Sequence, residues 1–101
     1  MGELHDWLSS QHHGLKTFKA FRNDLLDRVA SDASHRALYR LLAGLTEEYI
    51  ARYDGEAVPV DVAEQTFQHL LEIVDKAEGS LAASIPQQFQ ILNELAVAKL
   101  V

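Results

Sequence analysis

The chain has 101 residues, of which 48% are hydrophobic, and its formal net charge at pH 7 is −6. This length and composition predict one globular domain, residues 1–101, with a modest core. The acidic balance argues against nucleic acid as a partner, because nucleic-acid-binding proteins usually carry a basic excess. The lack of cysteine excludes disulfides, iron–sulfur clusters and thiolate zinc sites.

Neither a membrane span nor a secretion signal is expected. No run of about 18 apolar residues occurs in the chain. The N-terminal stretch, MGELHDWLSS, contains acids and lacks an apolar signal segment. These features predict a cytoplasmic protein that does not contact membranes.

Charge is unevenly distributed along the chain. Residues 13–40 carry a net charge of +3, whereas residues 41–101 carry −7. This polarisation favours a charged protein partner or self-association, although an ordinary solvated surface would also account for it.

The first predicted helix covers residues 3–30. Its apolar residues follow a spacing of three or four, with polar Gln11 in one slot, and share one helical face: Leu4, Trp7, Leu8, Leu15, Phe18, Phe21, Leu25 and Val29. A continuous helix over this range would be about 42 Å long, against about 25–30 Å for the later helices. The helix is therefore kinked or broken near Gly14, or its first turns extend beyond the bundle toward a partner.

A break would give Gly14 a specific role. It would be the C′ residue of the first segment, in the left-handed conformation that glycine adopts readily. His12 and His13 would then lie in the last turn, where a cationic imidazole interacts favourably with the helix dipole. In a continuous helix, which the unbroken periodicity favours, both histidines lie on the surface.

The later pattern predicts three more helices, at residues 34–53, 62–78 and 85–100. Asp54-Gly55 and Pro59 mark the connection between the first two of these. Asp61 and Glu64 have the spacing of a capping box at the next helix start. The predicted fold is all-α, a compact antiparallel bundle of four principal helices.

The helix predicted at residues 85–100 is apolar on two sides. Ser84, Pro86 and Gln87 suit its N-terminus. One side carries Phe89, Leu92, Ala96 and Leu100; the other carries Ile91, Leu95 and Ala98, with Val97 in a third sector. Such a helix is either central in the monomer or covered by a second copy or another partner.

No metal or cofactor is predicted. Carboxylate–histidine sites in helical bundles need several inward-facing His, Asp and Glu side chains on facing helices. Helical phase places His13 opposite its apolar stripe and sends His5, His12 and His69 away from theirs. Only His35, beside Asp32, lies near a core boundary.

The run His13-Gly14-Leu15-Lys16-Thr17 resembles the H-box of sensor histidine kinases and the His-x-Leu-Lys core of histidine phosphotransfer domains. The resemblance implies that His13 accepts the phosphoryl group and that Lys16 balances its charge. Gly14 and Phe18 stand where the H-box has an acid and a proline. A phosphoacceptor imidazole must face solvent on a bundle helix, which is where a continuous first helix would place His13.

The leading functional prediction is a non-enzymatic regulatory or adaptor protein that acts through helical surfaces as a homodimer. Its predicted interaction residues are Trp7, Leu8, Ile91, Leu95 and Val97. Histidine phosphotransfer through His13 and Lys16 is the first alternative. The second is a ligand-binding bundle with an apolar cavity lined by aromatic residues, namely Tyr39, Tyr49, Tyr53, Phe67 or Phe89.

Overall fold

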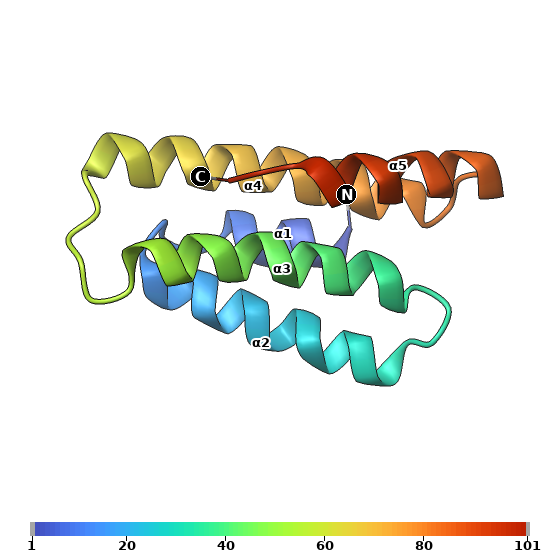
Figure 1. Ribbon diagram of the computed structural model, residues 1–101, viewed down its shortest axis with the longest axis horizontal. Helices are drawn as coiled ribbons and strands as arrows, with labels where there is room; N and C mark the ends of the chain where they lie inside the picture. The colour runs from blue at the N-terminus through green and yellow to red at the C-terminus, as the bar shows by residue number, and fades with distance from the viewer. Residues whose placement is uncertain (1, 101) are drawn as a thin grey trace.

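The computed structural model describes residues 2–100, and this part of the chain is helical with no strand. Five helices follow one another: α1 (Glu3–Ser9), α2 (Leu15–Ser31), α3 (Arg36–Tyr53), α4 (Val60–Ser80) and α5 (Ile85–Val97). Successive helices run antiparallel in an elongated bundle (Figure 1). The predicted all-α antiparallel bundle is confirmed, with five helices in place of four.

The helices are arranged around one hydrophobic core that receives side chains from all five. α2 and α3 form a closely packed hairpin, α1 packs on α4, and α5 packs on both α3 and α4. In Figure 1, α5 lies in front of α4 and α1 lies behind α3. The two shortest helices therefore fill opposite sides of the space between α4 and the α2–α3 hairpin.

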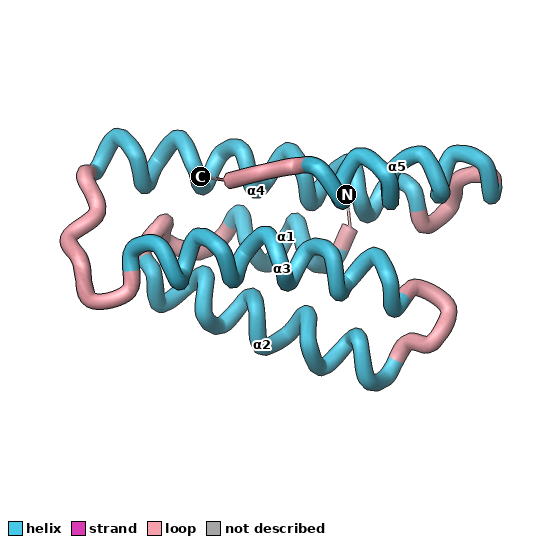
Figure 2. The backbone as a smooth tube through the Cα atoms, viewed as in Figure 1, coloured by secondary structure: helices cyan, strands magenta, loops and turns pink. Residues whose placement is uncertain are grey.

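The range predicted as one helix contains a break. α1 ends at Ser9, and residues 10–14 form a bent connection before α2 begins (Figure 2). The hydroxyl groups of Ser9 and Ser10 donate to the carbonyl oxygens of Asp6, at 3.1 Å, and Trp7, at 2.6 Å. Side chains thus satisfy carbonyl groups near the end of α1 that a continuing helix would bond to backbone N–H groups. The continuous helix was the wrong choice, and the break is confirmed.

The role predicted for Gly14 is also wrong. Its backbone is extended, with φ −78° and ψ 162°, and it is the N-cap of α2 and not the C′ residue of α1. The connection leads into α2 through an extended residue, which requires no left-handed conformation. The break has a different cause. It allows α1 to fold back onto α4, which buries Leu4 and Leu8 almost completely.

A carboxylate from the far end of the sequence caps α1. Glu78 of α4 accepts hydrogen bonds from the backbone N–H groups of Leu4, at 2.9 Å, and His5, at 2.8 Å. These are donors that the first turn of a helix cannot satisfy internally. A β-carbon at Gly2 would collide with the Glu78 carboxylate, so the close approach requires glycine at that position.

Two further helix limits differ from the predictions. α4 begins at Val60 after Pro59, so Asp61 lies inside its first turn and the predicted Asp61/Glu64 capping box is absent. The fixed backbone of Pro59 provides the entry instead, and the acid at Asp61 still suits the positive end of the helix.

The N-terminus of α5 has the predicted capping box between Ser84 and Gln87. The helix stops at Val97, before the predicted end at residue 100, because Ala98 adopts an extended backbone conformation. This departure from the helix brings Leu100 into the core, where it is 8% exposed.

Candidate functional site

The candidate site is the uncovered apolar surface of α5. Ile85 and Phe89, one helical turn apart, are 63% and 60% exposed, and Val97 is 78% exposed. The opposite side of the helix is anchored by Leu95, which is 6% exposed. We call Ile85, Phe89 and Val97 the α5 surface. Large apolar groups at this exposure are a recognised mark of interaction sites, because contact with water is unfavourable for them.

The structure shows which residues of the two apolar sides of this helix are covered. The side carrying Leu95, Ile91 and Ala98 packs against the core. On the other side, Leu92 and Leu100 also contact the core, whereas Phe89 and Ala96 face solvent. α5 contacts both α3 and α4, and the direction of these two supports sets which side is buried. The hydrophobic pattern alone showed that the helix has two apolar sides, but it did not show which residues of these sides are buried.

Two of the predicted interaction residues require correction. Leu8 is fully buried and Leu95 is 6% exposed, so neither is available to a partner on the folded monomer. Ile91 is half-buried and packs against the core. Trp7 retains 40% exposure while its ring stacks on Phe21, with centroids 6.3 Å apart.

Ile85 and Phe89 were missed as surface residues. The available signal was their spacing: Ile85 directly follows the N-cap, and Phe89 comes four residues later on the same side. Sequence reasoning assigned Phe89 to a possible core face, because periodicity cannot reveal which face a neighbouring helix covers. Val97 is the one predicted residue of α5 that lies fully on the surface.

His13 does not have the position expected of a phosphoacceptor. It lies in the connection between α1 and α2, is half-buried, and meets the ring of Phe67 edge-on at 6.4 Å. Lys16 is exposed in the first turn of α2. The prediction of a solvent-facing histidine on a helix is wrong, because the break at residues 10–14 removes this residue from any helical face.

The residues that the structure describes bring no metal-ligating cluster together. Among residues 2–100, no three His, Asp or Glu side chains are grouped closely enough to hold a metal ion. An open groove of about 480 Å³ lies on the outside of α4. The polar residues that line it include His69 and Glu72. This histidine–carboxylate pair therefore faces solvent, as helical phase predicts.

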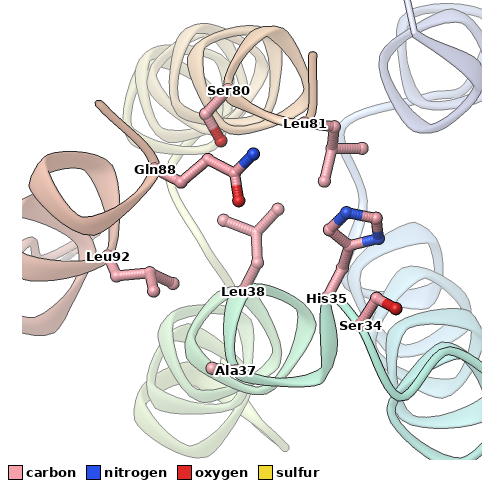
Figure 3. A pocket seen from close by; sticks show the side chains of 8 residues that line it. All are labelled: Ser34, His35, Ala37, Leu38, Ser80, Leu81, Gln88 and Leu92. Atoms are coloured by element: carbon pink, nitrogen blue, oxygen red, sulfur yellow. The ribbon is translucent and has the colours of Figure 1, made fainter. Parts of the chain in front are cut away.

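The pocket in Figure 3 lies at the end of the bundle where α3 begins and α4 ends. It has a volume of about 50 Å³, and its lining includes His35, Leu38, Ser80, Gln88 and Leu92. Ligand pockets usually measure about 300–1,000 Å³. At about 50 Å³, this pocket is far smaller than a usual ligand site.

Three of the aromatic residues proposed for a ligand cavity pack against other aromatic rings: Tyr49, Tyr53 and Phe67. The rings of Phe18 and Tyr49 are 4.3 Å apart between centroids, and those of Tyr49 and Tyr53 are 5.1 Å apart. Burial, with a smaller effect from Tyr53, raises the pKa of the Tyr49 phenol. Phe67 contacts Phe18, whereas Phe89 lies outside the core altogether. These side chains fill the space that a ligand would need.

Acid is expected to weaken the start of α3 through Asp32. Its Oδ2 lies 3.0 Å from Nδ1 of His35, and this hydrogen bond is the main cause that lowers the pKa of Asp32 below its ordinary value. Because the folded-state pKa is the lower one, the stabilisation is present above about pH 4 and is lost as the pH falls through the folded-state value. Urea unfolding of the wild type and Asp32→Asn should show a difference in midpoint that narrows below about pH 4. A difference that does not depend on pH would contradict this.

Comparison of the chain with models of known protein families, with curated proteins and with solved structures found no match. Across residues 2–100, no helix combines the length and the hydropathy needed to cross a lipid bilayer.

Proposed function

We propose that this protein is a non-enzymatic regulatory or adaptor protein that acts through helical surfaces as a homodimer. The observation that carries the proposal is the α5 surface, on which Ile85 and Phe89 remain more than half exposed. Burying such side chains against a partner yields about 25 cal/mol for each Å² of apolar surface removed from water. The packed aromatic core supports a surface function over a ligand-binding interior.

The helix that carries the α5 surface is fixed at both ends. A capping box between Ser84 and Gln87 and a proline in the first turn fix the start of α5. Leu95 anchors the other end of the helix in the core. Phe89 therefore stands on a rigid helix, which reduces the entropy lost when a partner binds.

Sedimentation velocity tests the proposal. The wild type is expected to form a dimer that weakens with dilution. Replacement of both Ile85 and Phe89 by glutamine is expected to raise the dissociation constant by about tenfold or more, because apolar and aromatic anchors dominate interface energies. Glutamine is a good helix former, so the thermal unfolding of α5 should be little changed.

Val60→Gln is the matched control. Val60 is 71% exposed and, like Ile85, is the first residue of its helix. Its replacement should leave the dissociation constant unchanged. A wild type that remains monomeric at about 1 mM, where even weak dimers form, would overturn the homodimer.

A further inference from the structure

The outer face of α3 carries a symmetric row of exposed residues. They are Ala37, Arg40, Gly44, Glu48 and Ala51, and all five are exposed. The spacings along the helix are three, four, four and three, so all of them lie on one helical face. A glycine lies at its centre, with a basic residue on one side, an acidic residue on the other, and a small residue at each end. We call it the α3 row.

Gly44 has no structural explanation within the monomer. It lies in the middle of α3, where glycine is less favourable than alanine because it loses more backbone freedom on folding. A β-carbon at this position would meet no atom within 4 Å. No residue of this monomer therefore requires glycine there, whereas a close neighbour from outside would.

Within residues 2–100, the charges of the α3 row have no ion-pair partner, although many other surface charges of the protein are paired. Arg22 bonds Glu47 at 2.9 Å, and Arg52 bonds Glu56 at 3.2 Å. Among residues 2–100, neither Arg40 nor Glu48 has a salt-bridge partner. They are eight residues apart on one helix, or about 12 Å along its axis, so they cannot pair with each other.

An antiparallel copy of the same helix would pair both charges. If α3 of a second molecule crosses at Gly44 about a two-fold axis, Arg40 of each copy lies opposite Glu48 of the other. Ala37 then lies opposite Ala51, and the two glycines meet at the axis. A two-fold interface needs such self-complementarity. If one residue of the first copy contacts a second residue of the other copy, the symmetry repeats the same contact in reverse. Small residues along the contact allow the helix axes to approach closely.

The charges at the ends of the contact do not oppose this arrangement. The same symmetry places Arg36 opposite Arg52, but the charge of Arg52 is balanced by Glu56. The guanidinium Nε of Arg36 donates to the carbonyl oxygen of Val29 at 2.7 Å, which ties that side chain to α2.

We propose that a second copy of this chain docks on the α3 row, antiparallel and with the two-fold axis at Gly44. This rests on the proposed homodimer and specifies its geometry. The first turns of α5 border the same interface, because Ala37 lines one pocket together with Gln88 and Leu92 (Figure 3). The α5 surface thus adds apolar area beside the polar and small contacts of α3.

Charge reversal tests the proposal by sedimentation velocity. Arg40→Glu and Glu48→Arg each replace two attractive pairs by two repulsive ones. Each is expected to raise the dimer dissociation constant by about tenfold at low salt. The double variant R40E/E48R restores complementarity and should return close to the wild-type value. A mixture of the two single variants should form a heterodimer, because each supplies the charges that the other lacks.

Two further variants separate the interface from general effects. Glu64→Arg makes the same charge change as Glu48→Arg at an exposed residue of α4 and should leave dimerisation unchanged. Gly44→Gln inserts a side chain where the monomer has open space, so it should weaken the dimer without lowering the melting temperature of the dilute monomer.

The results distinguish the two proposals. If neither single charge reversal nor Gly44→Gln changes the dissociation constant of the dimer, the interface lies elsewhere. This result would overturn the α3 row as the interface but not the homodimer. A wild type that is monomeric overturns both. Loss of dimer in both single variants with recovery in the double variant and in the mixture supports the antiparallel contact.

Discussion

Replacement of Phe18 by alanine is expected to lower the free energy of unfolding by about 3–5 kcal/mol. Phe18 is fully buried, its ring is 4.3 Å from that of Tyr49, and it meets Phe67 edge-on at 6.4 Å. It thereby joins α2, α3 and α4 at a single point. Truncation removes apolar burial and leaves a cavity that the surrounding rings cannot easily fill.

The expected loss is a large share of the total, since a domain of this size is stable by about 5–15 kcal/mol. Equilibrium unfolding in urea, followed by circular dichroism, measures it. Phe89→Ala is the matched control, because Phe89 is 60% exposed. At a concentration where the protein is monomeric, the control should change stability by no more than about 0.5 kcal/mol. Equal losses for the two phenylalanines would show that this packing is wrong.

Replacement of Glu78 by alanine is expected to lower the free energy of unfolding by about 2–4 kcal/mol and to release α1. The Glu78 carboxylate holds two backbone N–H groups at the start of α1, at 2.8 and 2.9 Å. Without it, these partly buried donors lose their partners, and the short helix cannot form by itself. Leu4 and Leu8 would then leave the core together with α1.

The single tryptophan reports this release. Trp7 lies on α1 and stacks on Phe21, so its fluorescence emission should shift to longer wavelength when α1 detaches. Glu78→Gln retains one carbonyl acceptor and should have an intermediate effect. Glu72→Ala, an exposed change on the same helix, should alter neither stability nor emission. Lower stability without any change in emission would mean that Glu78 does not hold α1.

Most of the helical content could be predicted from periodicity, because a core-facing helix repeats its apolar residues every three or four positions. α3 illustrates this: its predicted range of 34–53 matches Arg36–Tyr53 closely. The start of α5 was also predictable, since the Ser84 capping box involves only residues near in sequence. Local interactions of this kind need no knowledge of the rest of the fold.

The break near Gly14 could not be predicted from the local sequence. The spacing of Leu8, Leu15 and Phe18 fits one helix and two helices equally well. The decision depends on distant residues of α4, because α1 folds back onto this helix, where Leu4 and Leu8 are buried and Glu78 caps the first turn of α1. Because the expected surface position of His13 depended on a continuous helix, it failed together with that helix.

The sequence by itself determined the helical class, the acidic charge and the two apolar sides of the last helix. Only the tertiary structure decided that Leu95 is buried and that Phe89 is exposed. It also showed that Gly44 lies open on α3 between two charges, Arg40 and Glu48, that have no salt-bridge partner in the described part of the chain. The physical reason is the same in each case: periodicity records which residues can be buried together, but the helix that covers them comes from distant parts of the chain.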